Sequence, residues 1–324
     1  MARIDAHIHY MGDAPDSLGL LEQLDLKMLN ICVAEDAHGQ WRSQAEVYAH
    51  LAQEHPGRYA WCTSFDLPRF DDPQYVEKTI QGLEQDFAQG AVACKVWKNI
   101  GMEARAPSGE FLMVDDPLLE PIFSFVADRN KTLLMHIADP LDCWRPLYES
   151  SPHYGYYSAH PEWHLYGRDD VPSHQRMIEA RDAVVARHHD LRIVGAHLGS
   201  LEHDIAEVAK RFDRFPNFAV DISARLLDLA LQDAEKVRAF FLQYQDRILF
   251  GTDQGTWGLA SEMPASKRES LCSEMTNSYQ EHFRYLEKEG PMTISSREVL
   301  GIGLPEEVLE KVYRANARRW YPGL

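Results

Sequence analysis

Short runs of apolar and β-branched residues recur along this chain and mostly alternate with longer amphipathic segments. Eight such runs occur, at residues 2–9, 27–34, 58–65, 91–97, 132–137, 192–197, 218–222 and 247–253. The amphipathic segments include residues 73–87, 118–129, 173–187, 200–212 and 234–244, several of which open on Asp, Ser or Pro as helices do. Because parallel strands need long crossover connections, this alternation predicts a parallel α/β fold. Eight strand–helix units predict a closed (β/α)₈ TIM barrel, with a doubly wound open sheet as the alternative.

The length of 324 residues suits one such barrel with insertions, and no linker or low-complexity tract divides the chain. We therefore expect a single domain over residues 1–324. Two segments are longer than barrel connections require. The first, residues 139–172, is rich in aromatic residues and follows the fifth run; the second, residues 254–297, precedes a closing helix at 305–320. Loops after barrel strands lie on the face that holds active sites, so the aromatic insertion is a candidate pocket wall.

The charge balance and the cysteines narrow the class of protein. With 33 Lys and Arg against 50 Asp and Glu, the net charge of −17 disfavours nucleic acid and anionic membranes as partners. The cysteines are odd in number and widely spaced, which favours reduced core residues over a disulfide framework; they are Cys32, Cys62, Cys94, Cys143 and Cys272. No window approaches the ~20 apolar residues of a membrane span. We expect a cytoplasmic protein with a small-molecule substrate.

The first run ends in the sequence Asp5-Ala6-His7-Ile8-His9. Alternate residues of a strand face the same side, so His7 and His9 both point into the barrel mouth and can reach one metal ion. Two imidazoles suit Zn²⁺, Mn²⁺ or Fe²⁺. Taken alone, the pair is a weak indication, because two half-buried histidines in a strand are the plain alternative.

Three more residues of the kind that bind metals end other runs. His136 ends the fifth run, His197 the sixth and Asp253 the eighth. The carboxyl ends of barrel strands lie on one face, so these side chains converge with the histidine pair. The sequence therefore predicts a metal site there. Polar side chains satisfied by the loop backbone are the competing interpretation.

At this point the sequence resembles the amidohydrolase superfamily, and within it the amidohydrolase-2 branch that includes the aminocarboxymuconate semialdehyde decarboxylase-like enzymes. The motifs that carry the resemblance span nearly the whole chain: residues 5–9, Gly195-Ala196-His197, Phe250-Gly251-Thr252-Asp253, Leu304-Pro305-Glu306-Glu307 and Asn316-Ala317. They are specific for the superfamily but not for a substrate, because the branch includes carbon–carbon decarboxylases and lactone hydrolases.

The resemblance implies a role for each candidate residue. It implies that His7, His9 and His136 bind the metal, that Asp253 is both ligand and proton shuttle, and that His197 orients the reacting water or substrate. The physical roles agree, since a water bound to Zn²⁺ has its pKa lowered toward ~7. Asp253 can accept that proton and return it to the leaving group, and His197 can donate to the oxygen on which charge develops. The alternative for His197 is a ligand of a second metal.

Lys95 lies near the end of the fourth run, and Lys98 directly follows that run. The resemblance implies two options for Lys95. In binuclear relatives a lysine at this position is carboxylated and bridges two metals, whereas in the mononuclear branch it is usually unmodified. We favour a single ion, Zn²⁺ before Mn²⁺ or Fe²⁺, with Lys95 unmodified and pairing with Asp253 or a substrate carboxylate. Lys98 is interpreted as a solvated loop charge. Asp5 either supports a metal ligand or ties the barrel interior together.

Further residues are candidates for contact with the substrate. Arg225 follows the seventh run, and its guanidinium can hold a carboxylate in a two-pronged contact; an ion pair with an acid of the next helix is the alternative. In the aromatic insertion, Trp144, Trp163 and His164 are expected to line the pocket. The competing role of this insertion is a subunit contact, which leaves a homo-oligomer open.

These residues together favour a metal-dependent hydrolase that acts on a small carboxylated ester, lactone or amide. The close alternative is non-oxidative decarboxylation of an aromatic or muconate-like acid, which needs the same residues. A non-catalytic barrel that binds a metal or ligand is the alternative from another class.

Overall fold

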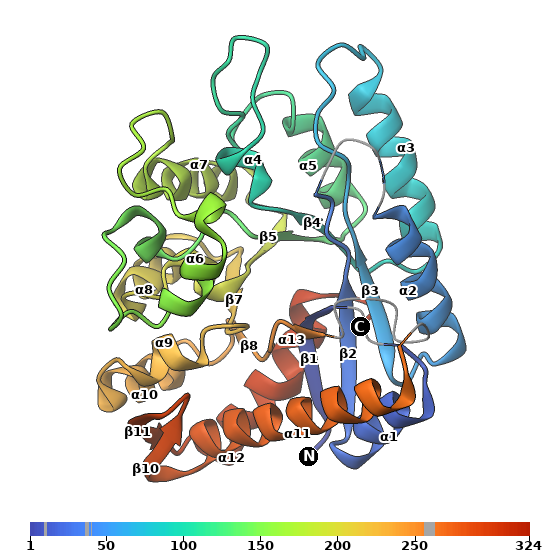
Figure 1. The fold of residues 1–324 in the computed structure, drawn as a ribbon. Helices are drawn as coiled ribbons and strands as arrows, with labels where there is room; N and C mark the ends of the chain where they lie inside the picture. The colour runs from blue at the N-terminus through green and yellow to red at the C-terminus, as the bar shows by residue number, and fades with distance from the viewer. Residues whose placement is uncertain (10–11, 36–38, 40, 256–262) are drawn as a thin grey trace.

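The computed structural model describes residues 1–9, 12–35, 39, 41–255 and 263–324, and the fold is built around one parallel sheet (Figure 1). The strands hydrogen-bond in the order β8-β7-β6-β5-β4-β3-β2-β1-β9. Their bounds are β1 Arg3–His9, β2 Leu26–Ile31, β3 Tyr59–Thr63, β4 Ala93–Val96, β5 Thr132–Met135, β6 Arg192–Gly195, β7 Phe218–Asp221, β8 Ile248–Leu249 and β9 Gln254–Gly255. Each of the eight predicted runs overlaps one of the strands β1 to β8, and only β2 begins one residue before its run.

The sheet closes on itself through the stretch 248–255, which contains β8 and β9. β8 pairs with β7, and β9 pairs with β1, both in parallel. Between these two pieces the Ala6 amide donates to the Phe250 carbonyl at 3.0 Å, and the Asp253 amide donates to the His7 carbonyl at 2.8 Å. β8 and β9 therefore act as one eighth strand that joins the seventh to the first. The fold is a TIM barrel, as predicted, and not a doubly wound open sheet.

Helices cover the outside of the barrel (Figure 1). The longer ones in the first three quarters of the chain are α1 Pro15–Gln23, α2 Arg42–Glu54, α3 Tyr75–Ala88, α5 Glu120–Asp128, α7 His174–Arg187, α8 Ile205–Arg214 and α10 Ala234–Gln243. Side-chain caps start three of them: Ser173 accepts from the Arg176 amide, Asp204 from the Ala206 amide and Asp233 from the Lys236 amide. Helix α8 begins five residues later than the predicted start at 200, because residues 197–200 form a left-handed turn.

Both long segments contain secondary structure. The insertion at 139–172 holds the 3₁₀ turns Leu141–Trp144 and Pro161–Trp163 and the short helix α6 Tyr154–Ala159. The second segment opens on β9, and its residues 256–262 lie outside the described ranges. Helix α11 Ala265–Glu287 follows, and then the hairpin of β10 Glu289–Ile294 and β11 Arg297–Ile302, which extends past residue 297. Two further short helices, α4 Asn99–Met102 and α9 Leu226–Ala230, follow β4 and β7.

The closing helix seals one end of the barrel. It consists of α12 Glu306–Glu310, a π-helical turn Lys311–Ala315 and α13 Asn316–Trp320. Trp320 is buried against residues of the strands, its indole donates to the Asp246 carbonyl at 3.0 Å, and Asn316 donates to the carbonyl of Ile248 at 2.8 Å. These acceptors lie before or at the start of β8, so the helix covers the end opposite the carboxyl ends of the strands.

The structure also describes the cysteines and the apolar character of the helices. All five cysteines lie within the described ranges and are free thiols, four of them buried. Among the described residues, no helix combines the length and the apolar character needed to cross a membrane.

Candidate active site

Three predicted ligands converge at the carboxyl ends of the strands. His7 and His9 come from β1, and Asp253 lies between β8 and β9. Asp253 Oδ1 is 3.4 Å from His7 Nε2 and 3.2 Å from His9 Nε2, and one ligand atom from each residue lies within 4.8 Å of the others. Asp253 has a left-handed φ of 61°, which turns its carboxylate back toward β1. This group has the donor types of a divalent metal site.

The two histidines are oriented through their other ring nitrogen. His7 Nδ1 lies 2.9 Å from Asp221 Oδ2, and His9 Nδ1 lies 2.9 Å from the Ile31 carbonyl. When Nδ1 carries the proton, it donates to these oxygens and the Nε2 lone pair is directed at the Asp253 side. Metal-binding histidines are commonly fixed in this way.

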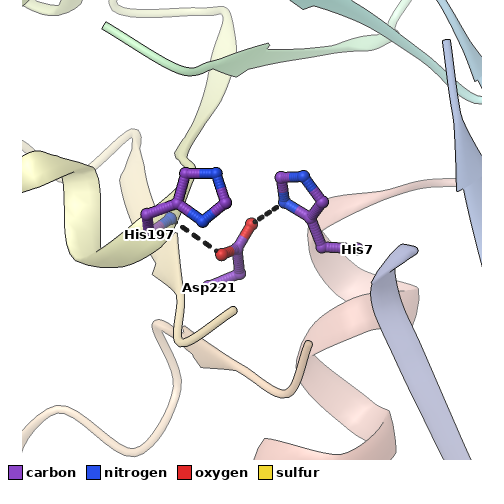
Figure 2. A group of neighbouring side chains, drawn as sticks. All are labelled: His7, His197 and Asp221. Atoms are coloured by element: carbon purple, nitrogen blue, oxygen red, sulfur yellow. Dashed lines mark hydrogen bonds and ion pairs between the residues drawn. The ribbon is translucent and has the colours of Figure 1, made fainter. Parts of the chain in front are cut away.

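Asp221, at the end of β7, was not among the predicted site residues (Figure 2). One of its oxygens faces His7, and the other accepts from the backbone amides of His197 at 2.9 Å and Ser223 at 3.1 Å. Burial alone would raise the pKa of Asp221, but His7 and these hydrogen bonds bring it below its usual value. The strand-end rule that selected His136 and Asp253 also applies to Asp221 and would have found it.

Protonation states fit the binding of a metal. Burial lowers the pKa of His9 to about 4 and that of His136 to about 3, and it also lowers the pKa of His197. These imidazoles are neutral at pH 7, which is the form that binds metals. Burial would raise the pKa of Asp253, but His197, His9 and His7 hold it well below its usual range, so the carboxylate is ionised.

His197 starts a left-handed turn that places its ring beside the ligand group. Residues 197–200 have φ values of 58°, 58°, 62° and 57°. A left-handed conformation costs about 1–2 kcal/mol per residue other than glycine, so surrounding contacts must hold the turn. His197 Nδ1 lies 3.0 Å from the Ser223 carbonyl, and Nε2 lies 3.9 Å from Asp253 Oδ2. Its ring centroid is 4.8 Å from that of His7.

His136 lies next to the ligand group but outside it. Its ring centroid is 4.4 Å from that of His197, and its Nε2 is 3.6 Å from Asp139 Oδ1. This buried nitrogen has no hydrogen-bond partner among the described residues. Among the described residues, two histidine nitrogens, a carboxylate and a neighbouring imidazole nitrogen without a hydrogen bond are a donor set that fits one divalent ion.

Asp5 joins three segments of the barrel through hydrogen bonds. Its carboxylate accepts from the backbone amide of His7 at 3.0 Å, from the Thr252 hydroxyl at 2.6 Å and from the Tyr279 hydroxyl at 2.6 Å. It thereby ties β1 to the stretch after β8 and to helix α11. Burial raises the pKa of Asp5 to about 6.

Lys95 and Lys98 are both buried, and the burial of Lys98 differs from what the sequence predicted. Lys95 is buried, and its Nζ lies 3.3 Å from His7 Nε2; burial lowers its pKa. Lys98 is not a solvated loop charge. It is only 5% exposed, binds both carboxylate oxygens of Asp139 at 2.8 Å, and lies 4.1 Å from the ring centroid of Trp163. The fold of the aromatic insertion over β4 buries it, which its sequence position does not indicate.

A cavity of about 780 Å³ opens onto the ligand group. Its lining residues are His9, Val33, Glu35, Lys95, Trp97, Lys98, His136, Asp139, Pro140, His153, Tyr156, Tyr157, His160, Trp163, His197, Ala224, Arg225 and Asp253. The metal candidates His9, His136 and Asp253 are thus in contact with the same space as much of the aromatic insertion.

Of the residues expected to contact a substrate, Lys95, Trp163 and Arg225 line this cavity, whereas Trp144 and His164 do not. The Trp144 indole donates to the Pro172 carbonyl at 2.9 Å, and the half-buried His164 ring has Nε2 3.0 Å from the Arg145 carbonyl. The insertion folds back on itself, and this turns both side chains away. Arg225 is 8% exposed, and its Nη1 donates to the Ala224 carbonyl at 2.8 Å.

Comparison with known proteins gives one family match and a group of related folds. The sequence profile of the amidohydrolase family matches residues 4–323. A search of curated proteins finds no significant match.

Similar solved structures include the following three, each aligned over 99% of this chain. A 2,6-dihydroxybenzoate decarboxylase from Rhizobium has 17% identity and a TM-score of 0.57, with 98% of its chain covered. A probable 2-pyrone-4,6-dicarboxylic acid hydrolase from Acinetobacter baumannii, with citric acid bound, has 10% identity and a TM-score of 0.51, with 99% covered. An amidohydrolase from Burkholderia multivorans with bound zinc has 14% identity and a TM-score of 0.50, with 99% covered. These likenesses concern the fold.

Proposed function

This chain belongs to the amidohydrolase family and is an enzyme, and we propose that it hydrolyses a small carboxylated ester, lactone or amide with the help of one divalent metal ion. The observation that carries the proposal is the convergence of His7, His9 and Asp253, with one ligand atom of each within 4.8 Å of the others, beside the cavity that His9 and Asp253 line. A bound divalent ion supplies Lewis-acid chemistry, polarising a substrate oxygen and making a bound water acidic.

We propose that the ion is held by these three residues together with His136. The buried Nε2 of His136 has no hydrogen-bond partner in the part of the chain that the structure describes, and the side chain lines the same cavity. Zn²⁺ is preferred because imidazole nitrogen and carboxylate oxygen are its usual ligands, and a structural relative has bound zinc. Mn²⁺ and Fe²⁺ are the alternatives.

Proton transfer is assigned to Asp253. Its side chain is 23% exposed, lines the cavity and is ionised, so it can accept a proton from a water and return it to the leaving group. His197 lies across from Asp253 and lines the same space. Its neutral ring orients the water or the reacting oxygen of the substrate.

Binding of the substrate is assigned to the cavity wall. Arg225 and Lys95 supply positive charge for a substrate carboxylate, and Trp163 supplies an apolar face. Trp97 and Trp163 meet edge to face with ring centroids 5.8 Å apart, and Tyr156 lies on the same wall. This wall suits a flat substrate.

The aromatic wall also favours a second candidate, the non-oxidative decarboxylation of an aromatic or muconate-like acid. Here Asp253 or His197 would deliver a proton to carbon. The likeness to 2,6-dihydroxybenzoate decarboxylase is compatible with this chemistry but extends only to the fold.

One experiment separates the three functions. Purified protein would be assayed for bound metal and then screened with lactones, esters, amides and aromatic carboxylic acids, recording acid release and CO₂ release separately. Hydrolysis without CO₂ supports the first proposal. Release of CO₂ from a substrate without a hydrolysable bond supports the second and overturns the first. Full metal content with no turnover of any compound would favour a non-catalytic binding barrel.

A further inference from the structure

We propose that Arg181, on helix α7, is a positioning residue that holds the His197 side chain in place for the reaction; this inference rests on the role proposed above for His197. Arg181 lies 16 residues before His197 in the sequence and does not line the cavity. It acts through the backbone of the left-handed turn at residues 197–200.

Arg181 is fully buried and held at both sides of its guanidinium. Its Nη1 donates to the Gly199 carbonyl within the turn. Its Nε and Nη2 donate to the same oxygen of Asp182, at 3.0 and 2.6 Å. The other oxygen of Asp182 accepts from Arg211 of helix α8 at 3.0 Å. The buried charge is therefore paired, and the direction of the Nη1 donor is set.

Helix α7 holds a second carbonyl of the same turn. His174 Nε2 lies 2.8 Å from the Ser200 carbonyl, so α7 binds two successive carbonyl groups. On the other side, Asp221 accepts from the His197 amide and Ser223 faces its Nδ1. The turn is held between α7 and the end of β7.

The conformation of the turn needs these contacts. Residues 197, 198 and 200 are not glycines, yet each has a φ between 57° and 58°. A Cβ at position 199 would lie 2.8 Å from Arg181 Nη1, so the guanidinium packs directly on the backbone there. Loss of the guanidinium would leave the Gly199 carbonyl buried without its donor, and the turn would relax toward a right-handed conformation. The His197 ring would then shift from Asp253.

The test compares R181M and R181K with R176M. Arg176 lies on the same helix but is exposed and paired with Asp115 at 3.1 Å, so its replacement controls for changes to α7. Each metal-loaded protein would be analysed for kcat, KM and metal content. Histidine-selective ¹⁵N labelling would record the His197 ring signals, assigned by their absence in H197Q.

For R181M we expect kcat to fall by ~10²-fold, KM and metal content to stay within about twofold, and the His197 signals to shift. R181K keeps the charge but cannot reach Gly199 and Asp182 together, and its kcat should fall by about tenfold. R176M should match the parent in every measurement.

Reduced stability of R181M with unchanged kcat and unchanged His197 signals would make Arg181 merely structural and overturn the inference. If R181M does not fold, R181K decides: parent-like kcat and parent-like His197 signals in that variant also overturn it. The NMR measurement needs no turnover. Full activity of H197Q would therefore refute the role proposed for His197, while shifted ring signals in R181K would still show that Arg181 positions the ring.

Discussion

At the scale of single residues, Asp253 has two proposed tasks, whereas each histidine has one. Its Oδ1 faces His7 and His9, and its Oδ2 faces His197. The carboxylate thus connects the ligand group to the residue proposed to orient the reacting atoms. Substitutions that keep an oxygen but remove the charge separate these tasks.

We predict that D253N retains metal but loses turnover. The amide oxygen can still bind a metal, whereas the group that accepts and returns a proton is gone, so kcat should fall by ~10²-fold or more. Metal content and kcat would be measured in parallel, with H9A as the variant that should lose both. Near-normal turnover of D253N at full metal content would contradict the proton-transfer role and make His197 the leading candidate.

Asp221 gives a second prediction at this scale. In D221N an amide nitrogen replaces one carboxylate oxygen, so the residue cannot accept from His7 and from the His197 and Ser223 amides as it does now. Metal affinity should fall about 10–100-fold, as expected when a group that orients a ligand is lost. Competition with a chelator measures this. D213N, at an exposed site on α8, is the control, and equal affinities in the two variants would argue against the orienting role.

At the scale of secondary-structure elements, the loops after β4 and β5 are joined by a buried ion pair. Lys98 follows β4, Asp139 follows β5, and both side chains are at most 6% exposed. Burial would raise the pKa of Asp139, but Lys98 and His136 hold it well below its usual range. The pair fixes one wall of the cavity beside His136.

We expect K98M to destabilise the fold by about 3–5 kcal/mol, because it leaves the Asp139 charge buried without its partner. The matched variant K78M removes an exposed lysine that pairs with Asp72 at the surface, and it should cost far less stability than K98M. Urea unfolding of both variants gives the comparison. Equal losses of stability would mean that the buried pair contributes no more than the exposed one.

At the scale of the whole molecule, the two ends of the barrel have separate roles. The carboxyl ends of the strands carry the ligand group and the cavity, while the closing helix covers the opposite end. A substitution in the closing helix should therefore lower stability without changing metal binding.

W320A tests this separation. Removal of a nearly buried indole and its hydrogen bond to Asp246 should cost about 3–5 kcal/mol of stability. Metal affinity of the folded variant should stay within about twofold of the parent, because Trp320 bonds to Thr132 and Asp246, at the end of the barrel opposite the ligand group. Thermal unfolding and chelator competition measure the two quantities, with the exposed Tyr148→Ala as control. A large loss of metal affinity in folded W320A would show that the two ends are coupled.

Much of this organisation was predictable from the sequence alone. Strand runs, helical periodicity and residue types at strand ends are local patterns, and they predicted the TIM barrel and the convergence of His7, His9 and Asp253. The roles of these residues, the metal and the substrate stay predictions. The single-domain organisation also stays a prediction.

Only the tertiary structure decided the contacts between segments far apart in the chain. It turned Trp144 and His164 away from the cavity, buried Lys98 against Asp139, and placed Arg181 on the turn that carries His197. Such contacts depend on how an insertion packs and on the side of a turn that a helix covers. Neither leaves a periodic signal in the sequence, because the interacting residues are 16 or more positions apart and share no repeat.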